Sequence, residues 1–190
     1  MLYGVRYERR FSSRKEELAF QRETAEKLLD WALKREWGLE LSALSRERTP
    51  EGRPYFSDCP VHFSVSHCKG LVCCGLSGAP LGVDGESRRP FRQPLVERVC
   101  TEEERSWIFR QRDREEAFLQ LWTLKESVMK LSGKGIAYGF QQARFTFEDG
   151  CPRFRDAGVV LSQFRLPGGW VVSAASAQEK FPEFQLVELP

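Results

Sequence analysis

The stretch Trp122–Gly135, which reads WTLKESVMKLSGKG, decides how the C-terminal half of this chain folds. Apolar residues recur before and within it at spacings of four, three, four and three residues, namely Ala117, Leu121, Leu124, Val128 and Leu131. That period predicts an amphipathic helix over about Glu115–Leu131, which Gly133 ends. Glu126 lies opposite the apolar side of this helix, and Lys130 follows one turn later on the same side.

The Glu126–Lys130 pair has two interpretations. An exposed pair four residues apart on a helix contributes only about 0.3–0.5 kcal/mol and carries no function. Trp122 shares the Glu126 side, however, and a tryptophan there indicates burial against another element. A partly buried acid beside Lys125 and Lys130 is more typical of a functional site than of a solvated helix face.

A second stretch, GVDGE at Gly82–Glu86, places two acids two residues apart. In a strand such residues point to the same face, so Asp84 and Glu86 present two carboxylates side by side. The alternative is a strand that ends in solvent, where acids are common.

A third stretch, FSVSHC at Phe63–Cys68, ends a predicted strand before the turn His67–Gly70. Ser66 and His67 fall at this junction, where hydroxyl and backbone N–H groups can hold an anion. The alternative is an ordinary hairpin turn with a satisfied histidine. A His67–Cys68 nucleophile pair is a poor option, because adjacent residues in an extended segment point apart.

Alternation, caps and turn residues predict the other elements. The predicted strands are Tyr3–Tyr7, Val61–Ser66, Leu71–Ser77, Leu81–Glu86, Ala143–Phe147, Val159–Phe164, Trp170–Ala175 and Phe184–Leu189. The other predicted helices run from Ser12 or Ser13 to about Trp37, over Leu95–Val99, and onward from a Thr101 cap. Arg46–Pro60 and Ser87–Pro94 are predicted loops. A helix followed by three strands occurs twice, without any repeat in the sequence itself.

Composition narrows the function classes. The 29 basic and 27 acidic residues leave a net charge of +2, which argues against wholesale nucleic-acid or membrane binding. No apolar run approaches the roughly 18 residues of a membrane span, and the first residues lack signal-peptide features, so we expect a cytoplasmic location. Six cysteines without CxxC spacing predict reduced, partly buried thiols, and two histidines argue against a multi-histidine metal site.

Taken together, FSVSH, GVDGE and WTLKESVMKLSGKG, with the turn Gly52–Pro54, resemble the 4′-phosphopantetheinyl transferases of the surfactin-synthetase-activating class. With looser similarity the match covers most of residues 1–147. The resemblance implies an α/β (α+β) fold built as a pseudo-dimer. Each subdomain is then a small, mostly antiparallel sheet packed with helices, over residues 1–82 and 83–190, with the site in the cleft between them.

The same resemblance implies a reaction. The 4′-phosphopantetheine group of coenzyme A passes to a serine of an apo acyl or peptidyl carrier protein, with Mg²⁺ present and 3′,5′-ADP released. Hard oxygen ligands suit Mg²⁺, and the implied ligands are Asp84, Glu86 and Glu126. Glu126 is the implied acceptor of the serine proton, and Lys130 is implied to stabilise the departing oxygen. The implied contacts to coenzyme A are Arg22, Arg53, Pro54, Ser66, His67, Lys125 and Lys130.

Gly85 departs from the family pattern, which has a bulky apolar residue between the two acids. A glycine there weakens a strand, so it predicts a less rigid Asp84–Glu86 pair. The implied docking surface for the carrier protein is Ser87–Val99, where an apolar centre would lie within a basic rim. The centre is formed by Phe91, Leu95 and Val96, and the rim by Arg88, Arg89, Arg92 and Arg98.

Two other functions fit parts of the pattern. A Mg²⁺-dependent phosphodiesterase or nuclease would also use paired acids and a Glu–Lys pair, although it favours a broader basic surface. A non-catalytic carrier-protein binder would need no acids, yet all three are present here. We therefore expect a monomeric transferase serving fatty-acid, polyketide or nonribosomal peptide synthesis, without nucleic-acid or membrane partners.

Overall fold

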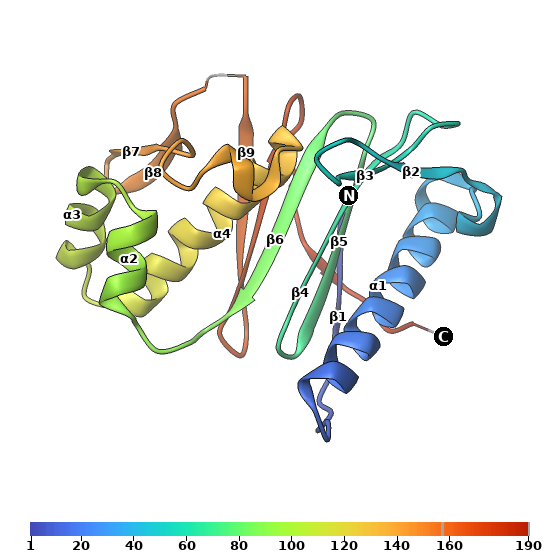
Figure 1. Ribbon diagram of the computed structural model, residues 1–190, viewed down its shortest axis with the longest axis horizontal. Coiled ribbons are helices and arrows are strands. Elements are labelled where there is room, and N and C mark those ends of the chain that lie inside the picture. Colours follow the sequence, from blue (N-terminus) through green and yellow to red (C-terminus); the bar gives the residue numbers. More distant parts are fainter. Residues whose placement is uncertain (157, 190) are drawn as a thin grey trace.

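Two small sheets, each covered by one long helix, make up this protein (Figure 1). The computed structural model describes residues 1–156 and 158–189. The first sheet has the strand order β11-β1-β5-β4 and the second has the order β6-β10-β9. Their strands are β1 Leu2–Arg6, β4 His62–Cys68, β5 Leu71–Ser77, β6 Leu81–Ser87, β9 Val160–Leu166, β10 Trp170–Ser176 and β11 Gln185–Leu186.

The two sheets share one topology. In the first half, β5 pairs antiparallel with both β1 and β4, and in the second half β10 pairs antiparallel with both β6 and β9. In both halves a long helix, a short 3-10 helix and a two-stranded ribbon come between the first and the second of these sheet strands. These elements are α1 Arg14–Trp37, η1 Leu41–Ala43, β2 Arg46–Arg48 and β3 Pro54–Phe56, then α4 Arg114–Ser132, η2 Gly135–Tyr138, β7 Phe145–Glu148 and β8 Cys151–Phe154. The predicted pseudo-dimer is therefore confirmed at the level of topology.

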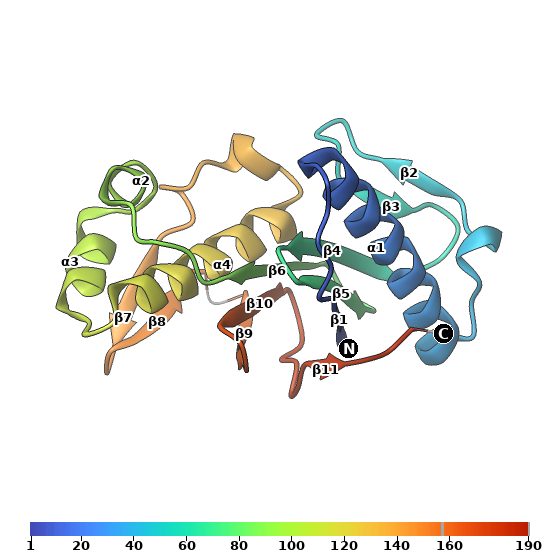
Figure 2. The same ribbon diagram turned by 90° about the horizontal axis from the view of Figure 1, so that it is seen from below.

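Both long helices begin and end where the sequence predicts. Ser13 accepts a hydrogen bond from the Glu16 backbone N–H, which caps α1, and Gly38 ends it with a left-handed φ of 65°. Asp113 caps α4, and Gly133 ends it with φ 74°. Figure 2 shows that α1 and α4 lie on the same side of the two sheets.

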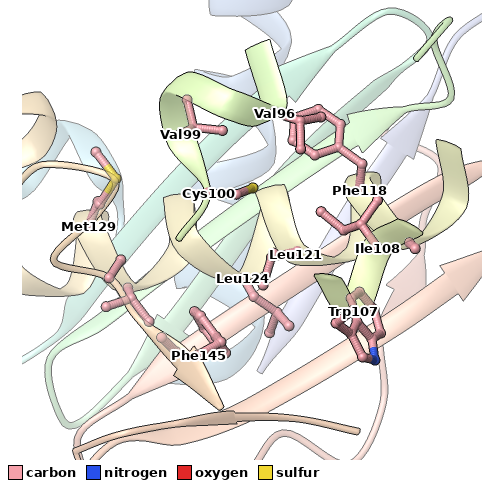
Figure 3. Close-up of a cluster of buried hydrophobic side chains, with 14 residues drawn as sticks. Val96, Val99, Cys100, Trp107, Ile108, Phe118, Leu121, Leu124, Met129 and Phe145 are labelled. Atoms are coloured by element: carbon pink, nitrogen blue, oxygen red, sulfur yellow. The ribbon is translucent and has the colours of Figure 1, made fainter. Parts of the chain in front are cut away.

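Each half has its own core. The first core lies between α1 and its sheet and includes Tyr3, Leu28 and Leu33. The second lies around α4, where helices α2 Gln93–Val99 and α3 Glu102–Arg110 are added, as Figure 3 shows. Leu121 and Leu124 of the predicted apolar stripe lie at its centre.

Some boundaries differ from the sequence predictions. The ribbon strands β2, β3 and β8 are not predicted, because they are only three or four residues long. His67 belongs to strand β4 and pairs with Val72, so the turn is only Lys69–Gly70. Strand β11 pairs with β1, so residues 185–186 join the first sheet instead of the predicted second subdomain.

The remaining sequence expectations concern thiols and membranes. All six cysteines are free, and Cys68, Cys73, Cys74 and Cys100 are buried. Over residues 1–156 and 158–189, no helix has both the length and the apolar character needed to cross a membrane.

Candidate active site

Asp84 lies where the two halves meet. It is 6% exposed on β6, and its Oδ1 atom accepts hydrogen bonds from Ser66 Oγ of β4 at 2.8 Å and from Lys130 Nζ of α4 at 2.8 Å. Lys130 also donates to the Val83 carbonyl at 2.9 Å. The second oxygen, Oδ2, is buried and has no partner among the described residues. One carboxylate thus joins both halves and keeps one oxygen free for a ligand.

Gly82 explains how Lys130 reaches this position. A Cβ atom on Gly82 would lie 2.0 Å from the Ser127 carbonyl oxygen and 2.4 Å from the Leu131 backbone nitrogen. Only a glycine allows α4 to pack this closely on β6. The close approach brings the α4 side that carries Lys130 next to the β6 face that carries Asp84.

The charge of Asp84 acts on two further acids, Glu86 and Glu126. Burial, followed by the charge of Asp84, raises the pKa of Glu126 to about 7, and Lys130 offsets only part of this rise. Burial and Asp84 also raise the pKa of Glu86. A carboxyl group that titrates near neutral pH can accept a proton during a reaction, as a general base must. The prediction that the Glu126 side is partly buried is confirmed.

Trp122 and Arg89 close one side of this carboxylate cluster. The Arg89 guanidinium carbon lies 5.1 Å from the Trp122 ring centroid, and an Arg89 nitrogen lies 3.7 Å from Glu86 Oε1. The Trp122 N–H is buried and has no hydrogen-bond partner among the described residues. The sequence predicts Arg89 only for the docking surface, although its position three residues after Glu86 is a usable signal of this contact.

His67, on β4, is surrounded by positive charge. Burial, followed by the charges of Lys130, Arg14 and Arg22, lowers the pKa of His67. Its Nδ1 atom is buried without a partner among the residues described. Arg22 is exposed on α1, and its charge acts on His67.

A pocket of about 250 Å³ lies beside this cluster, and we call it the Arg53 pocket. The first half contributes Arg53, Pro54 and Phe63 to its lining, and the second half contributes Lys130 and Gly133. Arg53, Pro54 and Lys130, three of the predicted coenzyme A contacts, therefore share one cavity.

Lys125 does not belong to this site, and its predicted contact with coenzyme A is wrong. Its side chain is fully buried, and Nζ lies 2.8 Å from Glu104 Oε1, from the Phe140 carbonyl and from the Ala143 carbonyl. An ammonium group has three N–H donors, so none is left for a phosphate. Lys125 points to a different side of α4 from Glu126, because adjacent residues of a helix do not share a face.

Ser66 also has a different partner from the predicted one. Ser66 is 8% exposed and its hydroxyl donates to Asp84, so it orients the carboxylate instead of meeting a phosphate. Gly85, between the two acids, does not interrupt β6, because it pairs regularly with Val172 of β10. The Sγ atom of Cys73 occupies the space that a side chain at position 85 would fill.

Part of the predicted docking surface is also unavailable. Val96 is fully buried in the second core, and Arg88 forms ion pairs with Asp113 and Glu115. Arg92 and Arg98 are exposed, while Phe91 and Leu95 are partly buried.

The carboxylate cluster suits a hard divalent cation by its chemistry. Asp84 Oδ2 is buried without a partner, and the raised pKa values of Glu86 and Glu126 indicate carboxylates that lack enough positive charge. Over residues 1–156 and 158–189, no three His, Cys, Asp or Glu side chains stand close enough together to hold a metal ion. Lys130 supplies the positive charge at Asp84 in this arrangement.

Comparison with known proteins adds a family to this geometry. A family model described as the 4′-phosphopantetheinyl transferase superfamily matches residues 80–172, which include β6 and α4. The chain is 34% identical to 4′-phosphopantetheinyl transferase psf-1 of Bacillus pumilus, over 60% of this chain and 51% of the relative. It is 32% identical to a putative 4′-phosphopantetheinyl transferase of Haemophilus influenzae, over 72% and 61%.

A third relative is 4′-phosphopantetheinyl transferase Sfp of Bacillus subtilis, which is 30% identical over 55% of this chain and 48% of the relative. The chain thus spans about half to three fifths of the length of these curated relatives. The matched segment carries Asp84, Glu86, Glu126 and Lys130, and over this segment the chain is similar to the 4′-phosphopantetheinyl transferase superfamily.

Proposed function

We propose that this protein transfers the 4′-phosphopantetheine group of coenzyme A to a serine of an apo acyl or peptidyl carrier protein. The observation that carries the proposal is the contact of both halves at Asp84, with Glu126 titrating near neutral pH beside it. The names of the relatives support the same reaction.

The transfer forms one bond and breaks another. The serine oxygen attacks the phosphorus that carries the pantetheine arm, and the bond from that phosphorus to the bridging oxygen breaks, releasing 3′,5′-ADP. Glu126 takes the serine proton, directly or through water, and its pKa of about 7 without metal is compatible with that role. Lys130 stabilises negative charge on the departing oxygen, and Asp84 holds Lys130 in place at 2.8 Å.

Substrate positioning uses the residues around the cluster. The Arg53 pocket suits the nucleotide end of coenzyme A, with Pro54 against the base, while His67 and Arg22 attract its phosphates. Mg²⁺ held by Asp84, Glu86 and Glu126 would shield the pyrophosphate charge. Glu126 would then have two roles, as a metal ligand and as the proton acceptor.

The exposed part of Ser87–Val99 remains the proposed docking surface for the carrier protein. Arg92 and Arg98 offer charge to an acidic helix, and Leu95 offers an apolar contact. We also propose that the protein is a monomer and that it acts in the cytoplasm, where coenzyme A is available.

Mass spectrometry tests the reaction directly. An apo carrier protein incubated with the protein, coenzyme A and MgCl₂ should gain the mass of one phosphopantetheine arm. Asp84→Ala should abolish the gain while circular dichroism stays unchanged, and EDTA should abolish it in the wild type. Binding to the carrier protein without any mass gain would favour a non-catalytic binder, and cleavage of a phosphodiester substrate would favour the nuclease alternative.

A further inference from the structure

Arg53 crosses from one half of the protein to the other. Arg53 is the last residue of the turn Thr49–Arg53, which joins the ribbon strands β2 and β3. The Thr49 N–H closes this turn by donating to the Arg53 carbonyl at 2.9 Å. Its guanidinium donates from Nη1 to the Leu131 carbonyl at 3.0 Å and from Nη2 to the Leu81 carbonyl at 3.3 Å. Burial lowers the pKa of this guanidinium, which is consistent with a group enclosed between two elements.

Both acceptors lie next to residues of the proposed reaction. Leu81 begins β6 three residues before Asp84, and Leu131 directly follows Lys130 on α4. Arg53 therefore contacts the two elements that carry the Asp84–Lys130 ion pair. Those elements are already packed together at Gly82, so the part that Arg53 holds in place is the ribbon.

The end of α4 is built to receive this guanidinium. The last carbonyls of a helix need outside donors, and here Ser132 Oγ bonds the Met129 carbonyl and the Gly133 N–H bonds the Lys130 carbonyl. The next carbonyl, that of Leu131, is satisfied by Arg53, and a cation is favourable at this negative end of the helix. Arg53 Cδ lies 3.4 Å from where a Cβ on Gly133 would be, so the glycine leaves room for it.

We propose that Arg53 is a positioning residue that fastens the β2–β3 ribbon, one wall of the Arg53 pocket, to α4 and β6. By doing so it sets the distance between the pocket and the Asp84–Lys130 pair. The expected effect of Arg53 on kcat rests on the proposed function, whereas its contacts with the Leu131 and Leu81 carbonyls do not. It differs from the simpler role of a direct phosphate contact, which the resemblance implies.

Steady-state kinetics separate these two roles. A lost phosphate contact raises KM for coenzyme A and leaves kcat unchanged, because such binding is equal in ground and transition states. A lost positioning contact lowers kcat even at saturating coenzyme A, and we expect at least about a tenfold fall for Arg53→Met. Arg53→Lys should recover only part of it, because one ammonium group cannot reproduce the forked geometry toward two carbonyls.

The matched control is Arg48→Met. Arg48 is an exposed arginine of the same ribbon, and it donates to the Gly52 carbonyl at 2.7 Å without crossing to the second half. Arg48→Met removes the same charge, and it should leave kcat within about twofold of wild type. An Arg53→Met variant with wild-type kcat and a raised KM would overturn the positioning role.

Two measurements need no turnover. Calorimetry with 3′,5′-ADP and 5′-ADP gives the preference for the 3′-phosphate. We expect Arg53→Met to keep that preference within about twofold of the wild-type ratio, since the positioning role involves no phosphate. Collapse of the ratio toward one would assign Arg53 to the phosphate instead.

Hydrogen exchange tests the contact itself. In Arg53→Met, amides of residues 46–56 should exchange faster while those of β5 keep wild-type rates, because only the ribbon is released. Unchanged exchange of the ribbon would contradict the proposal. If the wild type fails to modify any carrier protein, the proposed function fails, and these last two measurements still decide the role of Arg53.

Discussion

The Sγ atom of Cys73 lies 2.7 Å from the point that a Cβ atom on Gly85 would occupy. Cys73 belongs to β5 of the first half and Gly85 to β6 of the second, between the two acids of the site. The sulfur takes the volume that a bulkier residue at position 85 would fill. The glycine is thus matched to its neighbour in the other half, and β6 keeps regular pairing through it.

This relationship predicts a steric penalty. Gly85→Ala should lower the free energy of unfolding by about 1–3 kcal/mol, because the new Cβ forces the halves apart. Gly78→Ala is the matched control, since its Cβ would meet nothing closer than 3.9 Å. Urea denaturation measures both. In a Cys73→Ala background, Gly85→Ala should lower the free energy of unfolding by less than it does in the wild type. If the effects of the two substitutions on that free energy are strictly additive, the two side chains do not clash.

Glu126→Gln should affect activity and stability in opposite directions. The variant loses the proton acceptor, so kcat should fall by about 10²–10⁴-fold. The raised pKa of Glu126 means that the folded state prefers the protonated carboxyl, so stability is lost as the pH rises from 4.5 to about 7 and stays lower above that. Without metal, the variant should therefore be more stable than wild type at pH 8, with the difference disappearing below pH 5.

Glu116→Gln provides the control for Glu126, because Glu116 lies on the same helix and pairs with Arg165 at 3.2 Å and with Gln120. Its stability should stay within about 0.5 kcal/mol of wild type and its turnover should be normal. Normal turnover in Glu126→Gln would remove Glu126 from the proposed chemistry.

His67 should remain neutral in the free protein at neutral pH. Its lowered pKa means that the unfolded chain takes up the proton first, so stability is lost as the pH falls below 6.5. His67→Gln should flatten that loss. The chain has only two histidines, so NMR titration of His62→Gln follows His67 alone. Added coenzyme A should raise the His67 pKa, and an unmoved resonance would place the phosphates elsewhere.

Lys125 should contribute to stability through Glu104. Lys125→Met leaves Glu104 buried without its cation, which should cost about 3–5 kcal/mol in unfolding free energy. Lys125→Met with Glu104→Leu should recover much of this loss, because no charge remains buried. KM for coenzyme A should not change in either variant that folds. A raised KM would restore Lys125 to the substrate site.

The docking surface should respond to charge and to apolar contact separately. Arg92→Glu with Arg98→Glu should slow association with the carrier protein and flatten its salt dependence, because exposed charges mainly steer the encounter. Leu95→Ala should mainly speed dissociation. Surface plasmon resonance gives both rates. Arg35→Glu on the first half is the control, and equal effects from it would indicate non-specific attraction.

The sequence by itself determined the helices and the longer strands of both halves. The apolar stripe and glycine stop define α4, and the Ser13 and Thr101 caps mark the starts of α1 and α3. These signals are local, since a helix period and a cap need only neighbouring residues. The order of the acidic and basic stretches along the chain was also sufficient for the resemblance to a family.

Only the tertiary structure decided which side chains share a site. Lys125 and Lys130 look alike in sequence, yet one is sealed in the core with Glu104 and the other reaches Asp84. Arg53 meets α4 at Leu131, a partner 78 residues away that no local pattern announces. The β11 strand returns to β1 for the same reason. Burial and pairing across the two halves depend on which chain segments meet in space, and this sequence carries that information only through the fold.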